Sequence, residues 1–351
     1  MKIGLAYDRG VGAEKNEFEA MRCYGMAVNS GHANARNNLG YLYETGPKAL
    51  KDMAEAVKWY QRAAAYGNAW AQFNLGRLYL YGLGVKRNDE EAAYWLKKSF
   101  DAGCPRAVAA LSTMYAAGLG VAQDPHEAVT LAKKAVKQHS PEGAAVLGML
   151  YLEGLGVSKN SAEAVKLLKN AAQNGNAGGQ YALGVLFVRG EGVEKNAQEA
   201  VRLFRLAADQ GVIEAAAALG QIFESGQGVP VDFNEAARWY REAVEQGDVG
   251  SAVRLGNLLF LGQGVGTNIE EAVRLWTLAA DKGNAYAQFN LGRLYATGRG
   301  VPRDLQKAYS FLSLAGKTLD VSAQLKEVSS QLNNEGSVSQ RSKLQEQEPV
   351  D

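Results

Sequence analysis

The sequence predicts an all-α protein, an elongated helical scaffold built from one repeated unit. The first observation is an internal period of 36 residues, marked by a Leu-Gly pair or a conservative variant of it. The pair recurs without insertion at Ile3-Gly4, Leu39-Gly40, Leu75-Gly76, Leu111-Ser112, Leu147-Gly148, Leu183-Gly184, Leu219-Gly220, Leu255-Gly256 and Leu291-Gly292. The second observation is that residues 71–79 recur letter for letter at 287–295. Such even spacing indicates one continuous array of similar units, because separate globular domains have no common period.

The first helix of each repeat, helix A, is predicted by the residues around the Leu-Gly pair. An aromatic residue follows the leucine by four positions in every repeat except one, where Leu259 stands instead. Residues at i and i+4 lie on one face of a helix, so the leucine and the aromatic residue form one apolar stripe. The glycine between them has no side chain, and we expect a neighbouring helix to approach closely there. Helix A then ends in a Gly-x-Gly-Val turn, whose first glycine suits a left-handed C-cap.

The second helix, helix B, begins at an Asn or Asp that every repeat carries. These residues are Asn16, Asp52, Asn88, Asp124, Asn160, Asn196, Asp232, Asn268 and Asp304. A glutamate follows three residues later except at Lys307, which is the spacing of a capping box. Next comes an alanine in all copies, and a small-large-small pattern along one face lets two helices interlock. Helix B ends at a glycine in most repeats; where His139 replaces it, we expect the next helix to start at Ser140-Pro141.

The combined pattern A-x-x-x-L-G-x-x-Y-x-x-G-x-G-V-x-x-(N/D)-x-x-E-A…A-x-x-G closely resembles the Sel-one-like repeat, a family of the tetratricopeptide-like helical-repeat superfamily. The resemblance covers residues 1–317 as about nine units, the first of which lacks its front end. It implies antiparallel helix pairs stacked into a right-handed superhelical solenoid, with helix A on the concave side. It also implies an adaptor or scaffold that binds partner proteins or peptides.

The C-terminal end of the chain and one turn within the array depart from the repeat. Residues 318–333 are predicted to form a C-terminal capping helix, because Val321, Leu325, Val328 and Leu332 make one apolar stripe. Residues 334–351 are mostly Ser, Gln, Glu and Lys, and we expect a disordered polar tail there. Within the array, Gly46-Pro47-Lys48-Ala49 lacks the second glycine and the valine, so this turn should differ in shape.

Composition excludes several classes of partner. The 38 basic and 37 acidic residues leave no excess charge for nucleic acid or an anionic membrane surface. No apolar run is long enough to span a membrane. The first residues lack the pattern of a signal peptide, so we expect a cytoplasmic protein. Met1 falls in the middle of a repeat, and export is the alternative if a signal sequence lies upstream.

The sequence predicts no catalytic residue, metal site or cofactor. Its histidines, His32, His126 and His139, do not fall in a metal-ligand motif with one another or with cysteine. A phosphate-binding loop is disfavoured for the repeated glycines, since no strand precedes them and no P-loop lysine follows. A site assembled in space across several turns is the alternative that this pattern leaves open.

Partner binding is predicted on helix A, at positions that the repeat itself does not require. By analogy with tetratricopeptide repeats, the residues just before and two after the leucine should face the groove. With the surplus aromatic residues, the predicted binding residues are Asn38, Tyr41, Trp70, Asn74, Arg77, Tyr81, Arg254, Asn257, Phe260, Tyr286, Asn290 and Arg293. Asn and Arg suit peptide backbone and carboxylates. In the middle repeats the corresponding residues are Ala110, Val146, Val185 and Ala218, so the groove should be apolar at its centre. Packing between repeats is the alternative role for each residue.

Three functions stay open at this stage. The first and favoured one is a protein-interaction scaffold. The second is an enzyme of the β-lactam-related type, which belongs to a family branch that pins each repeat with a disulfide. Cys23 and Cys104 are too few to supply those pairs, so this branch is disfavoured. The third is an exported scaffold for the cell envelope.

Overall fold

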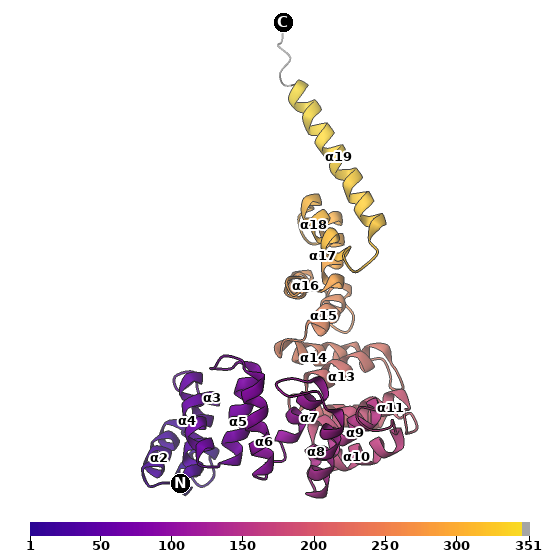
Figure 1. Ribbon diagram of the computed structural model, residues 1–351. Coiled ribbons are helices and arrows are strands. Elements are labelled where there is room, and N and C mark those ends of the chain that lie inside the picture. Colours follow the sequence, from indigo (N-terminus) through magenta and orange to yellow (C-terminus); the bar gives the residue numbers. More distant parts are fainter. Residues whose placement is uncertain (346–351) are drawn as a thin grey trace. The chain divides into compact units, whose positions relative to one another are not determined.

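The computed structural model describes residues 1–345, and all its regular elements in that range are α-helices (Figure 1). The A helices are α1 (Lys2–Arg9), α3 (Ala33–Thr45), α5 (Ala69–Tyr81), α7 (Ala107–Ala117), α9 (Pro141–Glu153), α11 (Ala177–Arg189), α13 (Ile213–Ser225), α15 (Val249–Leu261) and α17 (Ala285–Thr297). The B helices are α2 (Glu17–Asn29), α4 (Met53–Ala65), α6 (Asp89–Asp101), α8 (Pro125–Lys137), α10 (Ser161–Gln173), α12 (Ala197–Ala208), α14 (Phe233–Glu245), α16 (Ile269–Asp281) and α18 (Leu305–Ala315), and α19 (Ser322–Gln345) follows. The predicted alternation of A and B helices is confirmed.

The chain forms two compact units, Met1–Lys195 and Asn196–Asp351. In the first unit, helices α1 to α10 each pack against the next helix along the chain, and helices α12 to α18 do the same in the second unit. Contacts between neighbours in sequence are the signature of a stacked repeat. The predicted all-α solenoid is therefore confirmed.

The core of each repeat lies where a small residue of one helix meets a large residue of the other. The alanine that opens helix B is fully buried in every repeat: Ala20, Ala56, Ala92, Ala128, Ala164, Ala200, Ala236, Ala272 and Ala308. Helix A comes close through its glycine, since a Cβ added to Gly40 would lie 2.8 Å from the ring of buried Tyr60. In the fourth repeat Ser112 replaces the glycine, and the residue that corresponds to Tyr60 is Ala132. The volume added on one helix is thus removed from the other.

The polar ends of the helices are satisfied by the residues that the sequence predicted, with one difference. Every Asn or Asp cap accepts a hydrogen bond from a backbone N–H in the first turn of its B helix. Within each unit, however, the backbone N–H of the cap donates to the carbonyl of the aromatic position in the preceding A helix, at 2.9 Å for Asn16 and Tyr7. This bond takes the place of the second half of a capping box. The glutamate instead pairs one turn further on, as Glu199 does with Arg202.

The Gly-x-Gly turn joins consecutive repeats through its second glycine. The first glycine is the left-handed C-cap of helix A, as predicted, with φ between 66° and 71°. The second glycine also has positive φ, and it lies against the first residues of the preceding B helix. A Cβ at Gly120 would stand 2.0 Å from the backbone oxygen of Asp89. The two predicted departures are present: Gly46 is extended, and His139 has φ 60° before Ser140 caps α9.

The C-terminal helix is longer than the sequence predicted. α19 runs from Ser322 to Gln345, so the expected tail is wrong for residues 334–345. That segment has no proline and only one glycine, and its Gln, Glu, Lys and Arg residues favour a helix. The rest of the predicted tail, residues 346–351, lies outside the described residues. Buried Val328 packs with Leu305 and Leu312 of α18, which is a contact that a capping helix would make.

Candidate functional site: a groove along the A helices

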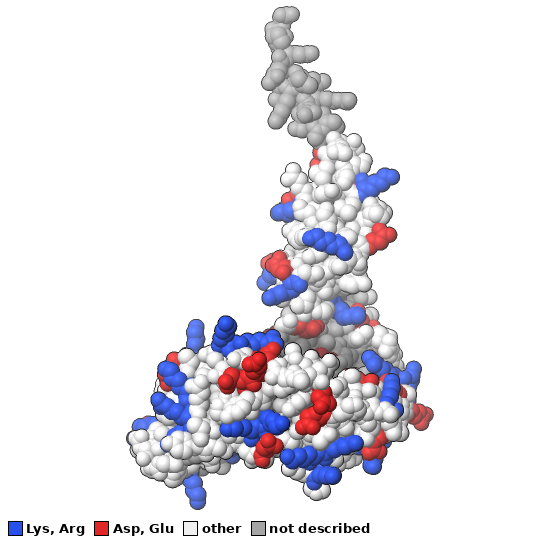
Figure 2. All heavy atoms as spheres, viewed as in Figure 1, with Lys and Arg blue, Asp and Glu red and all other residues white. Residues whose placement is uncertain are grey.

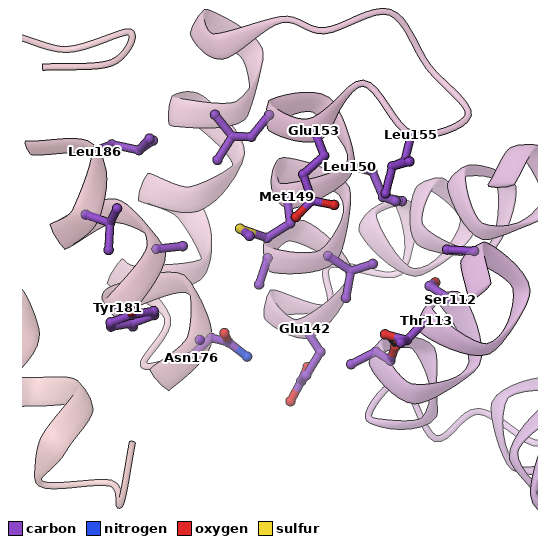
Figure 3. Close-up of a pocket in the computed structure, with 18 of the residues that line it drawn as sticks. Ser112, Thr113, Glu142, Met149, Leu150, Glu153, Leu155, Asn176, Tyr181 and Leu186 are labelled. Carbon is purple, nitrogen blue, oxygen red and sulfur yellow. Dashed lines mark hydrogen bonds between the residues drawn. The ribbon is translucent and has the colours of Figure 1, made fainter. Parts of the chain in front are cut away.

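Three consecutive A helices of the first unit, α7, α9 and α11, line an open groove of about 1120 Å³ (Figure 3). We call it the A-helix groove. Its lining residues are Ala109, Ser112, Thr113, Ala116, Ala117, Glu142, Ala145, Val146, Met149, Leu150, Leu152, Glu153, Leu155, Lys159, Asn176, Gly178, Tyr181, Ala182, Val185, Leu186, Arg189 and Glu191. In Figure 3, Met149 of α9 lies between Tyr181 of α11 and Thr113 of α7. The groove thus spans parts of three repeats.

The A-helix groove is wide because its walls carry small side chains. α7 contributes mainly alanines, and α11 has Gly178 and Ala182 on this face. The larger residues on the floor are apolar and accessible, with Met149 39% and Leu155 38% exposed. Exposed apolar side chains gathered in one concavity are typical of a site that receives an apolar ligand. Val146 and Val185, two of the four residues predicted at an apolar centre of the groove, line it, whereas Ala110 lines a neighbouring pocket.

The repeat geometry explains why the groove forms on the A helices. α7 contacts α9 directly, and α9 contacts α11, whereas no pair of consecutive B helices among the described residues makes such extensive contact. The Leu-Gly face of each A helix is turned toward its own B helix, as Gly148 against Leu168 of α10 shows. The opposite face, at positions such as Met149 and Val185, is left free to line the groove.

Charged residues are confined to a few places around the groove. Lys159 pairs with Glu191 at 3.0 Å, and this hydrogen-bonded ion pair lowers the pKa of Glu191. Glu142 accepts a hydrogen bond from Ser140 at 2.9 Å. Glu153 forms no ion pair with any other described residue. On the face of the molecule seen in Figure 2, basic and acidic side chains are likewise interspersed.

A smaller pocket of about 510 Å³ adjoins the groove between α5 and α7. We call it the arginine pocket, and it is lined by Phe73, Arg77, Leu80, Tyr81, Arg87, Arg106, Ala109, Ala110, Thr113, Met114 and Leu119. Ala109 and Thr113 line both cavities, so α7 forms a shared wall. The cavity on one side of α7 is mainly apolar, and the cavity on the other side is lined by the guanidinium groups of Arg77, Arg87 and Arg106.

Several predicted binding residues of the first unit take part in contacts between repeats. The side chain of Asn74 donates to Asn37 at 3.3 Å, and Asn37 donates to Asn38 at 3.4 Å. Arg77 forms an ion pair with Glu44 of the preceding A helix. These polar residues link neighbouring repeats, which is the packing role left open by the sequence.

The aromatic residues predicted in the first unit are accessible. Tyr41, Trp70 and Tyr81 are all exposed, and only Tyr81 lines the arginine pocket. The guanidinium carbon of Arg106 lies 5.2 Å from the ring centre of Trp70, which places Trp70 beside that pocket. The structure thus brings Trp70, Arg77 and Tyr81 into one region, and none of the twelve predicted residues lines the A-helix groove.

In the second unit, the predicted polar residues are again shared between packing and surface. Asn290 donates to Asn257 at 2.9 Å, and Arg254 pairs with Glu224 at 3.0 Å. Phe260 packs against Trp276, with ring centres 5.4 Å apart, while Tyr286 is exposed.

The two identical segments, residues 71–79 and 287–295, differ in what their arginine contacts. Arg77 pairs with Glu44, which also accepts a hydrogen bond from Tyr60 at 2.8 Å. The residue that corresponds to Glu44 in the second unit is Phe260. Arg293 is therefore exposed, and its guanidinium carbon lies 5.6 Å from the ring centre of Phe289.

Three buried tyrosines hold carboxylates at the ends of A helices. Tyr24 donates its hydroxyl to Asp8 at 3.0 Å, Tyr60 donates to Glu44, and Tyr240 donates to Glu224. Burial first, and then the facing carboxylate, raise the pKa of Tyr24 well above its ordinary value. The pKa values of Tyr60 and Tyr240 are raised for the same reasons.

Alkaline titration should reveal these three tyrosines. A group whose pKa is raised by folding contributes stability below its unfolded pKa, near 10 for tyrosine, and loses it as the pH rises. We expect Tyr24, Tyr60 and Tyr240 to ionise only as helicity is lost, because their pKa values are raised in the folded chain. Phenolate absorbance and circular dichroism recorded on one sample would show whether a late rise in absorbance accompanies the loss of helicity. A single phase near pH 10 with the helices intact would contradict this assignment.

Sequence reasoning missed the floor of the A-helix groove. Met149 stands two residues after Leu147, in the same column as Arg77 and Arg293, and was not among the predicted binding residues. The periodic pattern contained the signal, because this column holds apolar Met149 and Val185 in the fifth and sixth repeats, where the third and ninth carry arginine. Tyr181 and Leu155 belong to other columns, for which the pattern offered no functional indication.

Helix pairs stacked at a constant period, with a groove along their A helices, define this chain as a helical-repeat protein. The Sel1 repeat matches nine consecutive stretches, and the chain belongs to the Sel1 repeat family. The matched residues are 1–32, 33–68, 71–104, 105–140, 141–176, 177–212, 213–248, 250–284 and 285–317. Sel1 repeat proteins are generally protein-interaction scaffolds and typically not enzymes.

Solved structures of this family resemble the chain. A Sel1 repeat protein from Oxalobacter formigenes is 32% identical with a TM-score of 0.61, over 72% of this chain and 100% of that one. The protein c5321, a protective antigen present in uropathogenic Escherichia coli strains, is 25% identical with a TM-score of 0.48, over 100% of this chain and 86% of that one. A comparison with curated proteins finds no significant match. No helix among the described residues is long and apolar enough to cross a membrane.

Proposed function

We propose that this protein is an interaction scaffold that binds an apolar segment of a partner protein in the A-helix groove. The observation that carries the proposal is the groove itself, in which accessible apolar side chains of three A helices surround an open volume of about 1120 Å³. The general role of Sel1 repeat proteins as interaction scaffolds supports it.

The shape and chemistry of the groove favour a peptide segment over a small polar molecule. Its floor offers apolar contacts from Met149 and Leu152 of α9 and Val185 of α11, in two consecutive repeats, while the charged groups of Lys159 and Glu191 are engaged with each other. A helix or extended segment laid across such helices can insert a few apolar side chains, and burying each contributes about 1.5–3 kcal/mol. Placement on packed helices keeps the site rigid, which lowers the entropic cost of binding.

Introducing a charge on the groove floor should abolish partner binding. We expect Met149→Glu to weaken affinity by about tenfold or more, because the carboxylate must be desolvated against an apolar ligand. Leu206→Glu on helix B α12 is the matched control, since both residues are apolar, helical and 39% exposed. A photo-crosslinking amino acid placed at position 149 in the native cells would capture the partner, which is then purified for direct binding measurements.

The comparison of the two variants decides the proposal. Binding lost in Met149→Glu and kept in Leu206→Glu would support the A-helix groove as the site. Equal affinity of both variants for the captured partner would refute it.

A further inference from the structure

The arginine pocket extends the A-helix groove with a different chemistry. No Asp or Glu is among the described residues that line it, yet Arg77, Arg87 and Arg106 all do. Their carboxylate partners, which include Glu44 and Asp89, are not part of the lining. The chain as a whole is close to neutral, with 38 basic and 37 acidic residues, so the presence of three guanidinium groups and no carboxylate in the lining is a property of this pocket.

Each guanidinium group is held in place and keeps donors in reserve. Arg87 binds Asp89 through two nitrogens, at 2.8 and 2.9 Å. Arg106 stands over the ring of Trp70, and its contact with Glu142, at 3.8 Å, is too long for a hydrogen bond. A guanidinium group carries five N–H donors, so unused donors remain on each arginine.

The rest of the lining defines which anion would fit. Phe73, Leu80, Met114 and Leu119 supply apolar surface, and exposed Tyr81 adds a phenol. A highly charged, fully hydrated anion would lose its water against such walls, whereas a carboxylate attached to an apolar residue matches both halves of the pocket. Because Ala109 and Thr113 also line the A-helix groove, one continuous segment can occupy both cavities.

We propose that the arginine pocket receives a carboxylate of the partner segment whose apolar residues occupy the A-helix groove. The recognised feature is thus a protein segment with an apolar run and an acidic group at the end that reaches α5. This proposal rests on the proposed function and specifies the partner's chemistry. The carboxylate belongs either to an Asp or Glu side chain or to the C-terminus of the partner chain, and both sources offer the same bidentate acceptor to arginine.

A random-peptide library displayed on phage and panned against the full chain provides the probes. We expect enriched peptides to combine an apolar run with a carboxylate at one end. Synthetic versions of these peptides, labelled with fluorescein, are compared with versions in which Asp or Glu becomes the amide, and with versions that carry an amidated C-terminus. The first change tests a side-chain carboxylate, and the second tests a terminal one.

Protein variants locate the carboxylate. We expect removal of the peptide carboxylate to weaken binding about tenfold to the natural chain, and to have little effect on Arg87→Gln or Arg106→Gln. Arg202→Gln is the matched control, because Arg202 is an exposed arginine in an ion pair with Glu199, as Arg87 is with Asp89. Rising salt should weaken only the acidic peptides.

The outcomes separate this proposal from the proposed function. Peptides that depend on Met149 but not on any carboxylate, or that bind Arg87→Gln and Arg106→Gln as tightly as the natural chain, would overturn the role of the arginine pocket and leave the A-helix groove supported. A selection that enriches no peptide sensitive to Met149→Glu would overturn both.

Discussion

Replacement of Gly120 by alanine is expected to lower the free energy of unfolding by about 2–5 kcal/mol. The left-handed backbone accounts for about 1–2 kcal/mol with any side chain, and forced displacement of packed atoms adds about 1–3 kcal/mol. The new Cβ would lie 2.0 Å from the oxygen and 2.2 Å from the carbon of the Asp89 carbonyl. Since that contact joins the third repeat to the fourth, the substitution should separate α6 from the turn after α7.

Gly175→Ala isolates the effect of close approach. Gly175 also has positive φ, at 80°, but a Cβ added to it would meet nothing within 4 Å. We expect Gly175→Ala to lower the free energy of unfolding by only the about 1–2 kcal/mol that a side chain costs in a left-handed backbone. Urea unfolding of both variants gives the difference, and hydrogen exchange should place the Gly120→Ala defect in α6 to α8. Equal midpoints for the two variants would show that the second glycine of the turn is not an inter-repeat contact.

The second large effect is expected at Arg77, and not at its counterpart Arg293. Removing Arg77 leaves the carboxylate of Glu44 without its cation, and the Glu44 side chain is only 12% exposed. Arg77 itself is 29% exposed. Loss of a partly buried, hydrogen-bonded charge should destabilise the fold by about 2 kcal/mol. Arg293→Ala removes an exposed side chain that has no carboxylate partner among the described residues, and we expect a change of less than about 0.5 kcal/mol.

Identical local sequence makes this pair a controlled experiment. Both arginines lie in identical nine-residue segments, 71–79 and 287–295, so helix propensity and capping are matched. Thermal or urea unfolding of Arg77→Ala, Arg293→Ala and Glu44→Gln measures the comparison. Equal stability of the two alanine variants would mean that the Arg77–Glu44 pair does not hold the third repeat to the second.

This difference also bears on how binding at the two arginines is tested. A combined substitution of Arg77 and Arg293 would lower stability as well as remove surface charge. Any loss of partner binding would then have two causes. Arg87 and Arg106 are better probes, because both side chains are far more exposed than that of Arg77.

The sequence by itself determined the repeat and nearly all of its internal structure. Helix starts, helix ends and the buried alanines follow from neighbours within a few positions of each other, and such local rules can be read along the chain. The prediction failed for residues 334–345, where polar composition was taken as disorder although the residues favour a helix. The family followed from the same pattern, because period, caps and glycines are all local.

Only the tertiary structure decided which side chains are free to bind. Arg77 meets Glu44 across a separation of 33 residues, and the same step back from Arg293 reaches Phe260. Whether a side chain is paired or exposed thus depends on the residue that faces it from the neighbouring repeat. The sequence immediately around that side chain does not contain this information. In the same way, the A-helix groove exists because α7 and α11 carry small residues on the faces that adjoin α9. Each cavity is lined by residues from several repeats, so only the packing of those repeats shows where side chains leave space.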